Sequence, residues 1–231
     1  MQTTKCGPND ARTLFAETGF DPTFRRAVLG CRAICRVTSK VQMPDSIVVP
    51  TNRPLMIAAN HSSLFDLIAA LVFLGHFGMS GRFAVNSRFF TSTVGGGFLR
   101  GIGCIPFSRD DREQAEQTMV DSLIARQVTG IMPEGKITRA ADQVNGVGQA
   151  RPGLSRIARR SNAVVLPVAF VHSDIAWRPG TPLPKPRLGR HQVLARAGEL
   201  IDFTTDDHEA NAAQVMDSLG HLVMTGRELT H

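Results

Sequence analysis

Residues 55–77 read LMIAANHSSLFDLIAALVFLGHF, and this stretch decides how the chain folds. Its first five residues are apolar and run into Asn60, a pattern typical of a buried strand that ends in a turn. From Leu64 to Phe77 the sequence is apolar over a length that favours a buried helix. We therefore expect a strand, a tight turn and a helix, with His61 and Asp66 at the junction.

Strand and helix patterns alternate along the rest of the chain. Further short strands are predicted at 82–85, 104–107, 128–132, 164–170 and 192–197. Further helices are predicted at 110–127, 153–161 and 206–229, while 89–98 is ambiguous because three glycines interrupt it. The alternation predicts an α/β fold, a layered mixed sheet flanked by helices, with catalytic groups in the loops that follow strands. We expect residues 1–45 to form a lead-in and an amphipathic helix, and residues 46–231 to form the main domain.

The segment FRRAVLGCRAICRV, residues 24–37, combines apolar side chains with four arginines. On a helix its apolar residues can share one face, with the arginines on the flanks. These apolar residues are Leu29, Cys31, Ala33, Ile34, Cys35 and Val37. Such a helix can lie in a membrane interface, with its arginines near lipid phosphates. It can equally pack on the core as an ordinary amphipathic helix, and the sequence leaves both possibilities open.

The composition favours a globular protein with anionic partners. The formal net charge is +6 over 231 residues, and a basic surface favours nucleic acid, anionic lipid or phosphorylated substrates. Nucleic acid is disfavoured because the basic residues are scattered, zinc-finger spacing is missing and the chain has no tyrosine. No apolar run reaches the roughly 18 residues of a membrane span, and the N-terminus lacks the apolar region of a signal peptide. We therefore expect a protein that lies on a membrane rather than across it.

The four cysteines are Cys6, Cys31, Cys35 and Cys104. Cys31 and Cys35 are four residues apart and would share a helix face, which suits a metal pair or a disulfide. Neither has further partners at a recognisable spacing. We expect reduced, buried thiols in a cytosolic compartment.

His61 is the candidate catalytic residue. A histidine held at a strand–turn–helix junction can act as a general base, because its pKa lies near working pH. Asp66, five positions on, can reach back across the turn, accept a hydrogen bond from one ring nitrogen and stabilise the imidazolium. A substrate hydroxyl can then be the nucleophile, so no protein serine is needed. The alternative is that Asn60 and Ser62 only cap the helix and that His61 is incidental.

Two more stretches carry polar groups just after predicted strands. The first is GCIPFSR, residues 103–109, where Arg109 suits phosphate capture because its guanidinium can bind two oxygens. The second is IMPEGKITR, residues 131–139. It imitates a nucleotide-binding P-loop, but Ile137 stands where that motif requires Ser or Thr, and Glu134 adds negative charge. A fourth stretch, VVLPVAF at 164–170, indicates a core strand near an edge or a bulge.

These four stretches, in this order, resemble the lysophospholipid and glycerol-3-phosphate acyltransferase superfamily, and in particular bacterial 1-acylglycerol-3-phosphate acyltransferases. The matching blocks are NHxxxxD (60–66), GxIPFxR (103–109), PEG (133–135) and VxPVA (165–169). Arg151-Pro152-Gly153 also resembles the basic-x-Gly step that precedes the last block in this family. The resemblance covers residues 50–175 or so, and residues 1–50 match no motif.

The resemblance implies a reaction and roles for residues. His61 would deprotonate an acceptor hydroxyl, which attacks the thioester of acyl-CoA or acyl carrier protein, and Asp66 would orient His61. The implied acceptor is 1-acylglycerol-3-phosphate, which gives phosphatidic acid, on the cytoplasmic face of a membrane that the protein binds peripherally. The implied substrate-binding residues are Asn60, Phe107, Arg109, Glu134, Gly135, Lys136 and Arg139. No metal and no bound cofactor are implied.

One departure from the family pattern leaves the acceptor open. The family often has FPEGTRS, with arginine two residues after the glycine, whereas this chain has EGKITR. Lys136 or Arg139 can fill that place, and glycerol-3-phosphate, another lysophospholipid or an amino-lipid stay possible acceptors. Among other protein classes, a serine hydrolase lacks its GxSxG elbow here. A non-catalytic basic lipid-binding module would explain the charge but not the His61/Asp66 pair.

Overall fold

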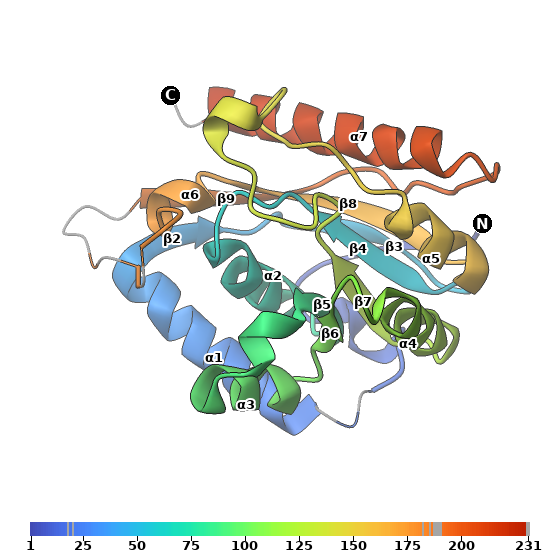
Figure 1. Cartoon of the computed structure of the whole chain (residues 1–231), viewed down its shortest axis with the longest axis horizontal. Coiled ribbons are helices and arrows are strands. Elements are labelled where there is room, and N and C mark those ends of the chain that lie inside the picture. The colour runs from blue at the N-terminus through green and yellow to red at the C-terminus, as the bar shows by residue number, and fades with distance from the viewer. Residues whose placement is uncertain (18, 20, 182, 185, 187–190, 230–231) are drawn as a thin grey trace.

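The computed structural model describes residues 1–17, 19, 21–181, 183–184, 186 and 191–229 (Figure 1). Its centre is a seven-stranded sheet in the order β2-β9-β8-β4-β7-β5-β6. In this order the strands are β2 (Ser39–Gln42), β9 (His191–Ala197), β8 (Val164–Val171), β4 (Leu55–Ala59), β7 (Val128–Ile131), β5 (Gly81–Asn86) and β6 (Ile105–Phe107). Strands β8 to β6 run parallel, whereas β9 is antiparallel to β8 and pairs in parallel with β2. The predicted layered mixed α/β sheet is confirmed.

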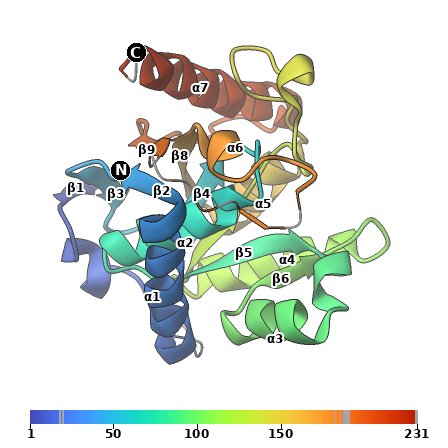
Figure 2. The same cartoon turned by 90° about the vertical axis from the view of Figure 1, so that its left-hand side faces the viewer.

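Helices cover both faces of this sheet. They are α1 (Asp21–Thr38), α2 (Phe65–His76), α3 (Thr93–Gly101), α4 (Arg112–Ile124), α5 (Gly153–Ser161), α6 (Ser173–Ala176) and α7 (His208–Glu228). Three short 3-10 helices are η1 (Asp10–Thr13), η2 (Ser87–Phe90) and η3 (Ala140–Asp142). Figure 2 shows α7 on one side of the sheet and α1 on the other. None of the helices in the described ranges has the length and hydropathy that a membrane-spanning segment requires.

The alternation of side chains along β4 explains why its sequence is apolar throughout. Leu55, Ile57 and Ala59 pack into one hydrophobic cluster with α1 and α2. Met56 and Ala58 pack into a second cluster with α4, α5 and α7. Successive side chains of a strand point to opposite faces, so a strand with helices on both faces has no polar side. The sequence pattern of this stretch therefore requires a central position in the sheet, which β4 occupies.

The predicted strands and helices are confirmed, with ends that shift by a few residues, and 153–161 matches α5 in full. The ambiguous 89–98 segment spans the end of η2 and most of α3. Three four-residue strands were missed. Strand β1 (Thr3–Cys6) lies in the expected polar lead-in and pairs with β3 (Ile47–Pro50), while β2 joins the main sheet. The expected core strand at 164–170 is confirmed as β8, and of the two alternatives, an edge or a bulge, the edge is excluded because β8 is an interior strand.

Helix α1 confirms the predicted N-terminal helix but not its single apolar face. Phe24, Val28, Cys31 and Cys35 are buried, and they belong to the cluster shared with α2. Other apolar residues of the segment point away from the core, with Leu29 64% and Val37 57% exposed. The physical reason is the spacing, because Leu29, Ala33 and Val37 recur every four residues and lie on the same outward face as the arginines. The helix packs on the core and also exposes apolar side chains.

Candidate active site

Asn60 fixes the end of β4 to its neighbour β8. The side chain is 2% exposed. Its amide nitrogen donates to the carbonyl of Phe170 at 3.3 Å, and its amide oxygen accepts from the N–H of Phe170 at 2.8 Å. The amide thus continues the pairing of two strands where the main chain leaves the sheet. The expected contact between Asn60 and substrate stays a prediction.

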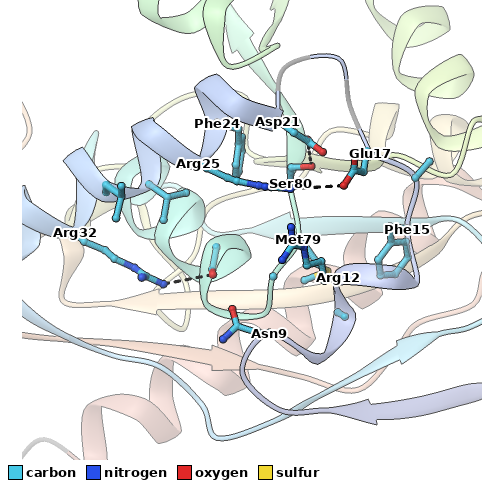
Figure 3. A pocket seen from close by; sticks show the side chains of 16 residues that line it. Asn9, Arg12, Phe15, Glu17, Asp21, Phe24, Arg25, Arg32, Met79 and Ser80 are labelled. Carbon is cyan, nitrogen blue, oxygen red and sulfur yellow. Dashed lines mark hydrogen bonds and ion pairs between the residues drawn. The ribbon is translucent and has the colours of Figure 1, made fainter.

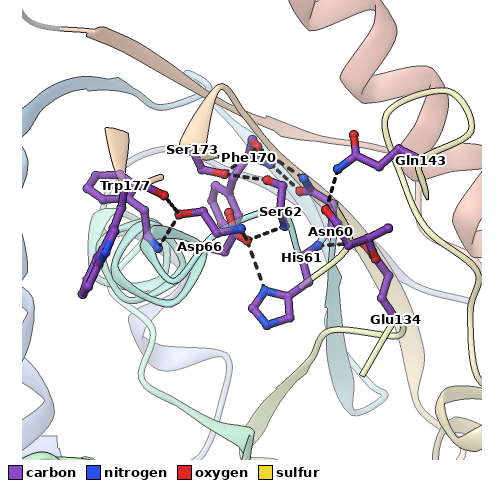
Figure 4. A network of polar contacts seen from close by, with 12 residues as sticks. Asn60, His61, Ser62, Asp66, Glu134, Gln143, Phe170, Ser173 and Trp177 are labelled. Atoms are coloured by element: carbon purple, nitrogen blue, oxygen red, sulfur yellow. Dashed lines mark hydrogen bonds and ion pairs between the residues drawn. The ribbon is translucent and has the colours of Figure 1, made fainter. Parts of the chain in front are cut away.

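The turn after β4 brings His61 and Asp66 together, as their spacing predicted. His61 Nδ1 lies 3.2 Å from Asp66 Oδ2, and the Asp66 side chain is fully buried (Figure 4). The same oxygen accepts the backbone N–H of Ser62 at 2.8 Å and of Ser63 at 2.7 Å. These donors lie at the positive end of α2, where a carboxylate is stabilised. The His61 ring is 19% exposed, so an acceptor hydroxyl can approach its other nitrogen.

Neither Asn60 nor Ser62 caps α2, which was the alternative that the sequence left open; the Ser62 hydroxyl lies 2.9 Å from the Ser173 hydroxyl instead. The Asp66 carboxylate accepts hydrogen bonds from the N–H groups of Ser62 and Ser63. The Ser63 hydroxyl accepts the N–H of Phe65, in the first turn of α2, at 3.0 Å. Ser63 also donates to the Trp177 carbonyl at 2.6 Å, which ties the turn to the segment after β8. Asn60 does not cap the helix. The polar groups of this turn orient the carboxylate that faces His61.

A second turn, residues 134–138 after β7, binds the main chain of His61. Glu134 Oε1 accepts the His61 N–H at 2.7 Å, and the N–H of Thr138 donates to the His61 carbonyl at 2.9 Å. The Thr138 hydroxyl donates to the other carboxylate oxygen, Glu134 Oε2. Burial raises the pKa of Glu134, and the hydrogen bonds from Thr138 and His61 oppose that shift. Glu134 was expected to contact the substrate. Its side chain is only 3% exposed and bonds the main chain of His61.

The exposed part of this turn carries the two basic candidates. Gly135 has φ of +66°, and a Cβ there would lie 2.9 Å from Arg151 Nε, so glycine is required on both counts. Lys136 and Arg139 are exposed on either side of the buried Thr138. Neither side chain makes a hydrogen bond or ion pair within the part of the chain that the structure describes. Both are exposed on the turn whose Thr138 bonds the His61 main chain.

Arg109 and Phe107 lie further along the same edge of the sheet. Phe107 ends β6 and is half-buried, while Arg109 follows it and is exposed. Strand β6 is three places from β4, whereas β7, which leads into the 134–138 turn, is its direct neighbour. Three strand spacings amount to about 14 Å. The strand order thus brings Arg139 closer to His61 than Arg109.

One cavity that the structure describes lies away from this site. It has a volume of about 290 Å³ and lies between η1, α1 and the C-terminal end of α2 (Figure 3). His61 precedes the N-terminal end of the same helix, so about 18 Å of helix separates the two. Within the described ranges, no three His, Cys, Asp or Glu side chains gather as metal ligands would. The four cysteines are buried, and burial raises the pKa of Cys104 to about 12.

Sequence reasoning missed Thr138, Ser63 and Trp177, because their contacts depend on tertiary structure. One signal was available for Thr138. The Thr-Arg pair of the family pattern EGTR occurs here two residues later, as Thr138-Arg139. The two inserted residues, Lys136 and Ile137, lengthen the turn and leave the threonine beside His61.

Comparisons with known proteins identify the family and a similar fold. A family model described as Acyltransferase matches residues 40–171, more than half of the chain, including both turns. The fold is similar to the crystal structure of the 1-acyl-sn-glycerophosphate (LPA) acyltransferase PlsC from Thermotoga maritima. The TM-score is 0.67 at 21% identity, and the match covers 90% of this chain and 81% of that one. A search of curated proteins found no match.

Proposed function

This chain belongs to the acyltransferase family, and from that membership we propose that it transfers a fatty acyl group from a thioester to the free hydroxyl of a lysophospholipid. The observation that carries the proposal is the His61/Asp66 pair. Asp66 Oδ2, 3.2 Å from His61 Nδ1, favours the tautomer with a proton on Nδ1. That tautomer leaves Nε2 free to accept a proton.

The proposed reaction needs one base and no covalent intermediate on the protein. His61 Nε2 takes the proton of the acceptor hydroxyl as its oxygen attacks the thioester carbonyl. The carbon–sulfur bond then breaks, and the leaving thiolate takes the proton back from the imidazolium. The buried Asp66 carboxylate stabilises the imidazolium between these two transfers. General-base catalysis of this kind contributes about 10²–10⁴-fold to the rate.

The acceptor we propose is 1-acylglycerol-3-phosphate, which yields phosphatidic acid, with acyl-CoA or acyl carrier protein as donor. Support comes from the exposed cations beside His61, because Arg139 and Lys136 can bind a phosphate within reach of the hydroxyl that reacts. Arg109, at the same edge of the sheet, is the third candidate. The fold similarity to an enzyme named for this acceptor points the same way.

We also propose that the protein binds the cytoplasmic face of a membrane peripherally, where its lipid acceptor lies. Residues 21–109 contain ten Lys and Arg but three Asp, an excess of seven positive charges, whereas the whole chain has an excess of six. This segment includes α1 and α3. The outward face of α1 exposes Leu29, Ile34 and Val37 among its arginines, a composition suited to an anionic lipid interface.

The nearby α3 region extends this surface. Phe89 in η2 is 37% exposed and Phe98 in α3 is 43% exposed. A Cβ on Gly101, at the end of α3, would lie 3.3 Å from Thr23 in the first turn of α1, so the two helices adjoin. We propose that the two helices together form one basic and apolar surface.

The direct test measures thioester consumption. The purified chain is mixed with acyl-CoA and lysophosphatidic acid in micelles, free thiol is followed over time, and the lipid product is identified by mass spectrometry. We expect thiol release that depends on the acceptor and yields phosphatidic acid, and no release from His61→Ala. Replacement of the donor by acyl carrier protein, and of the acceptor by glycerol-3-phosphate or other lysophospholipids, defines the substrates. Failure of every donor–acceptor pair would overturn the proposal.

A further inference from the structure

Both backbone polar groups of His61 are bound by one turn. Its N–H donates to Glu134 Oε1 at 2.7 Å, and its carbonyl accepts the N–H of Thr138 at 2.9 Å. The hydroxyl of Thr138 joins the two by donating to Glu134 Oε2. The contacts close a ring that runs from the His61 N–H through Glu134 and Thr138 back to the His61 carbonyl.

We propose that Glu134 and Thr138 are positioning residues, which hold the main chain of His61 and do not bind the acceptor. The inference rests on the proposed role of His61 as the base. Asp66 can orient the imidazole ring, but the ring's location depends on the His61 Cα, which lies between β4 and α2 and outside both. The Glu134–Thr138 pair supplies the hydrogen bonds that neither element provides there.

The burial of Glu134 argues against a contact with phosphate. Its side chain is 3% exposed, and both carboxylate oxygens accept hydrogen bonds from the protein. A negative carboxylate would also repel a phosphate. Phosphate recognition is left to the exposed side chains on the outer side of the turn, Lys136 and Arg139.

The chain packs closely against the Glu134–Thr138 pair. A Cβ on Gly148 would lie 2.6 Å from Glu134 Oε2 and nearer still to the Thr138 hydroxyl, so the chain passes against both. Gln143 Nε2 donates to the Thr138 carbonyl at 3.0 Å, and the N–H of Arg151 donates to the Pro133 carbonyl at 2.9 Å. These contacts hold the turn from the side that faces away from His61. The turn is therefore hydrogen-bonded both to His61 and to neighbouring segments.

Loss of the support is expected to act on the chemical step. Misplacement of a catalytic group by 1 Å can cost about 10²-fold in rate. Replacement of a positioning residue then lowers kcat and leaves the KM for the acceptor unchanged. Replacement of a phosphate-binding residue raises that KM.

Thr138 allows a matched set of variants. Thr138→Val removes the hydroxyl at nearly constant volume, and Thr138→Ser keeps it. Thr129→Val is the control, because Thr129 is also a buried threonine next to β4, but its hydroxyl has no partner among the described residues. We expect Thr138→Val to lower kcat about tenfold or more, with the acceptor KM within about twofold. Thr138→Ser should recover most of the loss, and Thr129→Val should match the unaltered chain.

Glu134 provides a second test that does not depend on the folding of the threonine variants. Glu134→Gln keeps an oxygen that can accept the His61 N–H, whereas Glu134→Ala removes it. We expect kcat to fall much further in Glu134→Ala than in Glu134→Gln. The kcat of each variant is calculated per folded molecule, and thermal unfolding gives the folded fraction. The inference is overturned if Thr138→Val and Glu134→Ala turn over normally, or if their losses lie in the acceptor KM. An unaltered chain without activity would instead refute the proposed function.

Discussion

His61 and Asp66 meet through a single carboxylate oxygen, Asp66 Oδ2, which lies 3.2 Å from His61 Nδ1 and also accepts two backbone N–H groups. The other oxygen, Oδ1, is buried and has no hydrogen-bond partner within the described residues. The carboxylate therefore has two unlike sides. One side accepts the hydrogen bonds of the turn and faces the ring, and the other is buried without a hydrogen-bond partner among the described residues.

His61→Ala should remove turnover and leave stability nearly unchanged. Among the described residues the ring makes one hydrogen bond, to Asp66, and both backbone hydrogen bonds of residue 61 remain in the variant. We expect the rate to fall by about 10²–10⁴-fold, with a thermal midpoint close to that of the unaltered chain. Assays with acyl-CoA and circular dichroism melting measure the two quantities. Near-normal turnover would show that another group is the base.

Asp66→Asn should lower turnover and also lower stability, unlike His61→Ala. An asparagine oxygen can still accept from Ser62 and Ser63, but its NH₂ group would then occupy the buried position of Oδ1, which has no hydrogen-bond partner among the described residues. A buried donor without a partner costs about 1–3 kcal/mol. Urea unfolding of the two variants side by side measures this difference. Equal stability of both would mean that the amide finds a partner by rearrangement.

Arg139→Ala and Arg109→Ala should each raise the KM for a phosphorylated acceptor more than the KM for the acyl donor. Hydrogen bonds to charged groups contribute about 1.5–3 kcal/mol, so we expect a rise of about tenfold or more. Arg160→Ala is the control, because Arg160 lies in the last turn of α5, which leads into the start of β8 at the opposite edge of the sheet. If Arg139→Ala affects both substrates equally, its role is structural.

The double variant Leu29→Ser/Val37→Ser should sediment less with anionic vesicles than the unaltered chain. These side chains are exposed on α1, and their apolar contacts with lipid are not screened by salt. High salt should release the unaltered chain in part, because each basic residue near an anionic surface contributes about 1 kcal/mol that salt screens.

The matched control for this experiment is Ile124→Ser, at the end of α4, which is 61% exposed but lies outside the α1–α3 surface. Deletion of residues 1–38 is unsuitable, because it would remove Phe24, Val28 and Cys31 from the core. Equal sedimentation of the double variant and the unaltered chain would exclude α1 as the anchor.

Glu134→Gln should gain stability relative to the unaltered chain as the pH rises. Burial raises the pKa of Glu134, so the folded state binds this proton more tightly than the unfolded chain does. The stability that this proton confers is present below the unfolded pKa and is lost as the pH rises toward the folded pKa. The variant lacks this titration. Urea unfolding at several pH values checks the trend, and a difference that does not vary with pH would contradict it.

The strand–turn–helix at residues 55–77 could be predicted because its apolar pattern is local and unbroken. The spacing of His61 and Asp66 was enough to predict their contact, since one turn of chain joins them. The short strands β1, β2 and β3 could not be predicted, because four residues carry little periodicity and each pairs with a distant segment.

Contacts of the site that involve several segments were also beyond the sequence. The sequence around Thr138 is that of an ordinary loop, and its contact with His61 follows only from the pairing of β7 with β4. The burial of Glu134 depends on the same pairing. For α1, apolar residues occur on both faces of the helix, so the pattern alone could not tell which face packs on α2.

The central position of β4 has a consequence for the order in which the chain assembles. Its two neighbours, β7 and β8, are made about 70 and about 110 residues later, so a chain emerging from the ribosome carries an apolar strand with no partner on either side. His61 meets Glu134 and Thr138 only after β7 has docked, and Asn60 and Ser63 need Phe170 and Trp177, which come with and after β8. A nascent chain that ends before Trp177 contains His61 and Asp66 but lacks at least one of the contacts that hold their turn. Competence for chemistry thus arrives late in synthesis, together with the closing of the sheet.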